Sequence, residues 1–162
     1  MKENETLKIN PLPSKTWYWL HLNDTTVKWN GNVQPCMVTT EEPEQVSEAG
    51  LNMKEMTTGA GAEADTLFSD ENLPVLQLTA KAEDGERIIR LDISSEDKEN
   101  AAGTVYIAAE ENARVTVIEK FTSGKKAQSD LAFRTKLYAK KNSTIRLIQI
   151  NMLDEGQRLL NA

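Results

Sequence analysis

Catalytic chemistry in this chain would have to come from very few of the residue types that usually perform it. The 162 residues include one cysteine, Cys36, and one histidine, His21. A thiol activated by an imidazole is a nucleophilic dyad, but one residue of each type is too few for a Cys₄, Cys₂His₂ or His₃ zinc site. An iron–sulfur cluster likewise needs several thiolates. We therefore interpret both residues as packed or surface side chains and expect the isolated chain to hold no stable cluster.

Other stretches match binding motifs only in part. "GAGAEA" at 59–64 has no strand before it and lacks the third glycine of a dinucleotide fingerprint, and "SGKK" lacks the upstream glycine of a P-loop. The acidic groups "EEPE" and "SSEDKEN" lack the spacing of a calcium loop. Trp17 and Trp19 have no basic neighbours that would suit base stacking, so we assign them to a core or an interface. The sequence thus predicts no catalytic, cofactor-binding or metal-binding residue.

The second half of the chain has the pattern of β-strands. "LPVLQLTAKAEDGERIIRLDIS" alternates apolar and polar positions on both sides of "EDGE", whose Asp-Gly pair is a hairpin-type turn signal. Two later stretches follow the order strand, polar corner, strand, with the corners at "EEN" and "KKN". We therefore predict β-structure for residues 73–153, within a second region that spans 73–162.

The first region, 1–72, is predicted to be mixed or partly helical. Its start is polar and contains two prolines, and "TWYWLHLND" fits a strand or a short helix equally well. "NGN" at 30–32 is a turn signal. Thr40 is placed to cap a helix that has Pro43 in its first turn and ends near Gly50, and "AEADTLF" fits a second short helix.

A repeated phrase connects the predicted strands. Aligning Asn112 with Asn142 places Val115–Glu119 over Ile145–Gln149 and Ala108 over Ala139, while "RIIRLDI" is a looser copy one period upstream. Repeats of about 20–50 residues are typical of stacked folds, and asparagine tolerates the left-handed backbone of a tight corner. The spacing is also compatible with an antiparallel sandwich whose hairpins look alike, so the repeat alone leaves both folds open.

Composition narrows the class of protein. The length suits one domain with a real core. The net charge of −6 argues against a phosphate-backbone partner. The sequence has neither the apolar core of a signal peptide nor an apolar run of about 18 residues. A single cysteine fits a reducing compartment. These features predict a soluble cytoplasmic protein.

Two of these stretches resemble a known family. "NPLPSKTWYWLHLND" resembles the opening of clostridial-type SufD proteins, and "TVYIAAEENARVTVIEKF" resembles the core phrase of the SufB/SufD family. The resemblance covers most of the chain and is weakest across 35–72. It implies a single-stranded parallel β-helix after an N-terminal helical region. It also implies a cytoplasmic scaffold that works with the SufC ATPase to assemble iron–sulfur clusters, and family members pair through their β-helices.

The resemblance has one departure. The chain stops at "DEGQRLLNA", where the family continues with further rungs and a C-terminal helical segment. The family's cluster-building residues and its SufC-docking region lie in that later part, so no site residue is carried over. An uncovered last rung, with Ile148, Ile150 and Leu153 at its end and "RLL" as the possible start of another, predicts a homodimer joined near residues 145–160.

We therefore expect a non-enzymatic SufD-like scaffold whose partners are SufB- and SufC-type proteins. The alternative is a β-helix carbohydrate-active enzyme, a lyase or hydrolase, which needs paired carboxylates with an arginine or lysine on one exposed sheet. Glu119, Lys136 and Arg146 are the outward residues that such a site would use. A third possibility is an interaction domain of unrelated fold.

Overall fold

The computed structural model describes residues 5–9, 25–29, 32–41, 53, 56, 59–69 and 71–162, and this part of the chain is mainly β. The strands are β1 (Glu5–Ile9), β2 (Thr25–Trp29), β3 (Gln34–Pro35), β4 (Met37–Thr40), β5 (Val75–Ala80), β6 (Glu86–Ser94), β7 (Asn100–Ala109), β8 (Arg114–Thr122), β9 (Ser129–Ala139), β10 (Thr144–Met152) and β11 (Gln157–Asn161). The short helices are α1 (Ala62–Asp65), η3 (Thr66–Phe68) and η4 (Ala82–Asp84).

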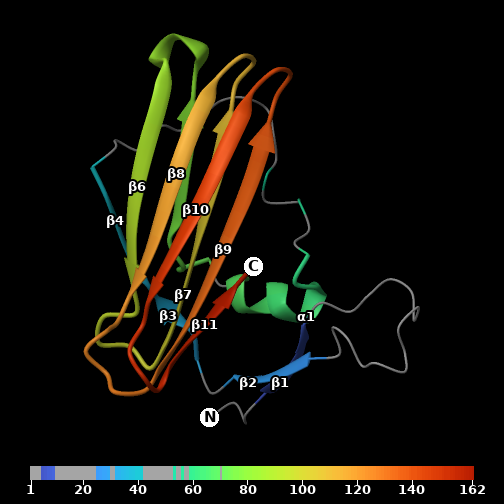
Figure 1. The fold of residues 1–162 in the computed structure, drawn as a ribbon. Coiled ribbons are helices and arrows are strands. Elements are labelled where there is room, and N and C mark those ends of the chain that lie inside the picture. The colour runs from blue at the N-terminus through green and yellow to red at the C-terminus, as the bar shows by residue number, and fades with distance from the viewer. Residues whose placement is uncertain are drawn as a thin grey trace.

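From β5 onward, consecutive strands lie in two different sheets (Figure 1). The first sheet has the order β10-β8-β6-β4, and the second has the order β11-β9-β7-β3, with β5 also paired to β7. Neighbouring strands are parallel in both sheets except for β4, which runs antiparallel to β6. Each strand therefore pairs with the strand two places along the chain, as the predicted repeat requires.

The predicted register of the repeat is confirmed. Val117 pairs with Leu147 on one side and with Ile89 on the other, and all three strands run in the same direction. The antiparallel sandwich is therefore wrong for these strands. One detail of the alignment is also wrong: Ala108 pairs with Tyr138, and the partner of Ala139 is Ala109. The offset of 30 residues that aligns Asn112 with Asn142 holds before the corner as well, and it places Ala109 beside Ala139.

Two asparagines occupy equivalent corners of successive repeats. Asn112 has φ 63° and Asn142 has φ 56°. Asparagine adopts this left-handed conformation at a lower cost than most side chains. The side-chain amide of Asn142 donates to the side-chain oxygen of Asn112 at 3.4 Å. The corner residue therefore turns the chain from one sheet to the other and also contacts its copy in the neighbouring repeat.

The hairpin predicted at "EDGE" is not present. Gly85 has φ 69° and ends the turn η4, so the Asp-Gly signal does mark a sharp turn. The strands on either side do not pair with each other, because β5 belongs to the second sheet and β6 to the first. Their alternating apolar residues instead point into the space between the two sheets.

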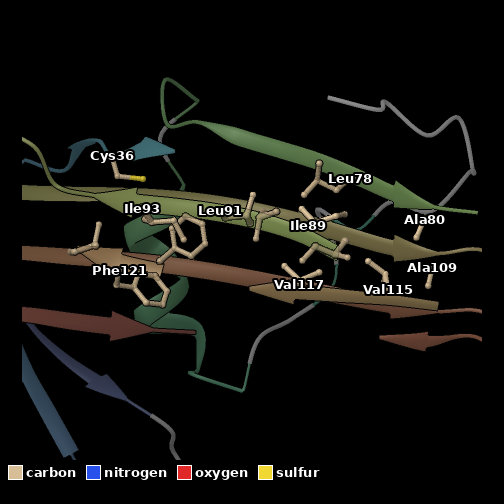
Figure 2. Close-up of a cluster of buried hydrophobic side chains, with 14 of the residues drawn as sticks. Cys36, Leu78, Ala80, Ile89, Leu91, Ile93, Ala109, Val115, Val117 and Phe121 are labelled. Carbon is tan, nitrogen blue, oxygen red and sulfur yellow. The ribbon is translucent and has the colours of Figure 1, made fainter. Parts of the chain in front are cut away.

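The main core fills that space (Figure 2). Its members are fully or almost fully buried aliphatic and aromatic side chains from both sheets, and Phe121 contacts Phe133 edge-on with ring centroids 5.7 Å apart. Cys36 belongs to this core at 6% exposure. A Cβ atom on Gly103 would lie 2.4 Å from the Cys36 sulfur, so only glycine lets β7 approach the thiol this closely.

The N-terminal elements pack against the outer face of the second sheet. The predicted helix "AEADTLF" is confirmed as α1 followed directly by η3. Leu7, Trp29 and Phe68 form a second cluster with Ala102 and Ala132, which face outward from β7 and β9.

Thr40 is the last residue of β4. The helix expected after it, the aromatic stretch "TWYWLHLND" and the Asn30-Gly31 turn lie outside the described residues. None of the described helices is long and apolar enough to cross a membrane.

Candidate functional site

Of the two residues that would form a thiol–imidazole dyad, only Cys36 lies in the described part of the chain. Cys36 lies in the core, and burial raises the pKa of its thiol to about 12. A thiol in that state stays protonated at neutral pH, and the thiolate is the reactive and metal-binding form. Cys36 is therefore a packing residue. His21 lies outside the described residues.

The three residues considered for a carbohydrate-active site do not share a surface. Glu119 was expected to face outward, and this expectation is wrong: it is 0% exposed and lies between the sheets. Lys136 lies on the outer face of the second sheet, while Arg146 is exposed on the outer face of the first. The alternation along β8 explains the error, because Glu119 has the same parity as the inward-facing Val117.

Glu119 is a buried carboxyl group that connects three strands. The hydroxyl of Thr135, on β9 in the opposite sheet, donates to Glu119 Oε1 at 2.7 Å. The amide of Gln149, its register partner on β10, donates to Oε2 at 2.9 Å. Burial raises the pKa of Glu119, and the two hydrogen bonds counteract this only in part. The group is therefore able to hold a proton inside the fold, where it joins the two sheets.

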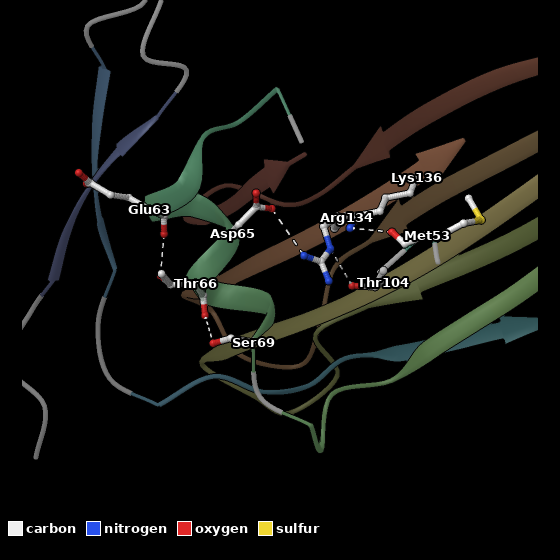
Figure 3. A network of polar contacts seen from close by, with 8 residues as sticks. All are labelled: Met53, Glu63, Asp65, Thr66, Ser69, Thr104, Arg134 and Lys136. Atoms are coloured by element: carbon white, nitrogen blue, oxygen red, sulfur yellow. Dashed lines mark hydrogen bonds and ion pairs between the residues drawn. The ribbon is translucent and has the colours of Figure 1, made fainter. Parts of the chain in front are cut away.

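A polar network on the outer face of the second sheet attaches the helical segment (Figure 3). Arg134 of β9 is largely buried, and its Nη1 lies 3.5 Å from Asp65 Oδ1 of α1. Its Nε donates to the hydroxyl of Thr104 on β7 at 3.3 Å, and its guanidinium carbon lies 4.7 Å from the centroid of the Phe68 ring. The charge is thus stabilised by an ion pair, a hydrogen bond and a cation–π contact.

Lys136 lies two residues further along β9 and faces the same way. Its Nζ donates to the backbone oxygen of Met53 at 2.9 Å and lies 5.6 Å from the Tyr106 ring centroid. Burial lowers the pKa of Lys136, the charge of Arg134 lowers it further, and Asp65 opposes the shift. Together, Arg134 and Lys136 hold Met53 and the helical segment α1–η3 against the sheet.

A second ion pair, between exposed Arg158 and buried Asp130, lies near the contact of the last strand with the N-terminal strands. Arg158 of β11 donates through both Nε and Nη2 to the carboxylate of Asp130 on β9, with 2.6 Å for the Nε contact. Its Nη2 also donates to the backbone oxygen of Lys28 on β2 at 3.0 Å. Hydrogen bonding to Asp130 raises the pKa of Arg158. One guanidinium therefore binds the last strand to the N-terminal ribbon, the antiparallel pair formed by β1 and β2.

The sequence did not single out Arg134, Asp65 or Arg158. The alternation of side chains along β9 puts Arg134 and Lys136 on the same face of the sheet. From the sequence alone, two basic residues on one face suggest a face exposed to solvent. The burial arises because a helix distant in sequence covers it.

The described residues hold no group of three or more histidine, cysteine or acidic side chains that could bind a metal ion. Arg134, Lys136 and Arg158 contact acidic side chains, a hydroxyl group or backbone oxygens, and they organise the contact between the N-terminal elements and the second sheet. Searches of protein-family models, of curated proteins and of solved structures found no significant match to this chain. The arrangement is therefore interpreted from its own geometry.

Proposed function

We propose that this protein is a SufD-like scaffold component of the cytoplasmic iron–sulfur cluster assembly machinery, built on a single-stranded parallel β-helix. The observation that carries the proposal is the repeat. Val117 is in register with Ile89 and Leu147 on parallel strands, and consecutive strands alternate between two sheets. A β-helix is the fold in which such a repeat continues rung after rung. The sequence resemblance supplies the family and the activity.

A scaffold of this kind acts through its surfaces. Two stacked sheets with a close-packed core form a rigid body, and Asp65, Arg134, Asp130 and Arg158 are occupied in attaching the N-terminal elements to it. SufB- and SufC-type proteins are the proposed partners, and the cluster is cargo of the complex. The carbohydrate-active alternative gains no support, because Glu119 is buried between the sheets while Lys136 and Arg146 lie on the outer faces of different sheets.

Partner capture tests the proposal. An affinity-tagged form of the chain, mixed with purified SufB- and SufC-type proteins, is expected to retain both through extensive washing. An unrelated ATPase of similar size should stay in the flow-through, which controls for non-specific capture. Recovery of the tagged chain alone, in the presence or absence of nucleotide, would remove the scaffold assignment while leaving the fold untouched.

The same proposal includes self-association near residues 145–160. β10 pairs only with β8 among the described strands, so the backbone groups on its other edge have no strand beside them. Ile148 and Ile150 on β10 are each 40% exposed. Pairing of two such edges about a two-fold axis would satisfy the backbone and cover these side chains.

Light scattering during size-exclusion chromatography should therefore report a mass twice the 18.1 kDa of one chain. Ile150→Lys places a charge at the edge and is expected to give the monomer mass. Lys141→Ile, at an exposed corner, serves as the matched control and should leave the mass unchanged. A wild-type monomer at every micromolar concentration would contradict the self-pairing.

A further inference from the structure

The outer face of the first sheet is open, whereas that of the second is covered. The N-terminal ribbon, α1 and η3 pack on the second sheet, and no described element lies over β6, β8 and β10 on their outer side (Figure 1). Along each of these strands, alternate side chains point away from the core. This outer face therefore presents a continuous surface across three paired strands.

The surface is unusually rich in exposed apolar side chains. In the described part of the chain, seven large hydrophobic residues are exposed, and two of them, Val75 and Leu137, belong to the second sheet. The other five belong to the first sheet and face outward: Met37 (42%), Ile88 (46%), Ile148 (40%), Ile150 (40%) and Met152 (56%). Contiguous apolar side chains on a protein surface mark interaction sites, whereas scattered ones are normal.

Basic side chains lie among these apolar ones. One row across the three strands consists of Ile88, Thr116 and Arg146. The next row on the same face consists of Arg90, Ile118 and Ile148. The outward charged residues of the three strands are four basic and two acidic: Arg90, Arg114, Lys120 and Arg146 against Glu86 and Asp92.

The two acidic residues are already balanced locally. Asp92 forms an ion pair with Lys120 at 3.5 Å, and Glu86 is the register partner of Arg114. The positive charges that these acids leave unbalanced are Arg90 and Arg146, which are both exposed. A net positive face on a chain whose net charge is −6 is a local reversal of sign. Such reversals orient an oppositely charged partner during encounter.

We propose that the outer face formed by β6, β8 and β10 docks an acidic segment of a partner protein whose apolar side chains pack on the isoleucines. Carboxylates of the segment pair with Arg90 and Arg146, and its apolar side chains cover Ile88, Ile118 and Ile148. A nucleic acid fits less well, because its phosphates would meet an acidic protein and its backbone makes no use of the exposed isoleucines. This inference rests on the composition of the face and does not depend on the scaffold assignment.

Fluorescence polarisation with a defined probe tests this surface. The probe is a fluorescein-labelled synthetic peptide of about ten residues in which glutamate alternates with valine, which as an extended chain matches the length of the strands. It should bind the full chain, and binding should weaken as salt is raised because the contacts are partly ionic. The same peptide with lysine in place of glutamate should not bind.

Variants on β6 locate the site away from the edge strand β10. Arg90→Glu combined with Ile88→Ser should weaken probe binding by about tenfold or more. Lys141→Glu, at an exposed corner outside the face, should leave it unchanged. Ile88, Arg90 and Lys141 are all exposed, so unchanged melting temperatures are expected to show that the variants fold.

Three results would overturn the proposal. They are the absence of probe binding at low salt, equal binding by the β6 and corner variants, and displacement of the peptide by a thymidine oligonucleotide of equal affinity. The third would make the face a general polyanion site. Loss of self-pairing with retained probe binding would separate this surface from the dimer edge on β10.

Discussion

Replacing Val117 with aspartate is expected to lower the free energy of unfolding by roughly 3 kcal/mol or more. The Val117 side chain is 0% exposed and lies in the core with Ile89 (Figure 2). Leu147 is its register partner on the other side. A carboxylate at this position would lose its hydration and have no cation among the surrounding apolar side chains. Because the position repeats through three strands, the loss would disturb the contact between successive repeats as well as a single site.

The neighbouring residue gives a matched control. Ile118 is on the same strand, one residue along, and points to the outer face, where it is only partly buried. Ile118→Asp should therefore cost much less than Val117→Asp when both are measured by urea unfolding followed by circular dichroism. If the two variants lost equal stability, or if Val117→Asp melted like the wild type, the inward assignment of Val117 would be wrong.

Replacing Glu119 with glutamine is expected to stabilise the protein at pH values above the raised pKa of the folded-state carboxyl group. Burial raises the pKa of Glu119 in the folded state, while the unfolded chain has the ordinary value near 4.3. Between these two pKa values the folded protein binds more protons than the unfolded chain, so the stability of the wild type falls as pH rises. Above the pKa of Glu119 in the folded state, the wild type has lost all of the stability that depends on the protonated carboxyl group. Below the pKa of the unfolded chain, none of this stability is lost.

Glutamine removes the charge but keeps the hydrogen-bonding capacity. Its amide accepts from one of the present donors, Thr135 or Gln149, and the other partner can rotate or flip to accept from it. The variant is expected to be measurably more stable at neutral pH, because each unit by which folding raises a pKa corresponds to about 1.4 kcal/mol. The difference between the two proteins should disappear as the pH approaches 4.

Thermal melts of both proteins across this pH range measure the effect. Glu111→Gln, which removes the same charge from an exposed corner, is the matched control and should follow the wild-type curve. A Glu119→Gln variant that was less stable than the wild type at neutral pH would show that ionised Glu119 supports the fold.

Several features of this protein follow from local patterns in its sequence. The alternation of apolar residues marks the strands, and the recurrence of Asn112 and Asn142 marks equivalent corners, because each pattern reflects the backbone geometry of a few adjacent residues. Stacking then makes the pairing register of these two repeats equal to the repeat length, so Leu147 was predictable as a partner of Val117. The short helix "AEADTLF" was predictable for the same local reason.

The tertiary structure alone decided which of these local elements meet. The turn at Gly85 is visible in the sequence, but only the partners β7 and β8 assign the strands on either side of it to different sheets. Glu119 was expected to face outward although it has the same parity along β8 as Val117, and its burial is made possible by hydrogen bonds from Thr135 and Gln149, which other repeats supply. Arg134 became a buried anchor because Asp65 and Phe68, far away in the sequence, cover it. Burial is a property of all the segments that surround a side chain, and a local pattern carries no information about segments that are distant in sequence.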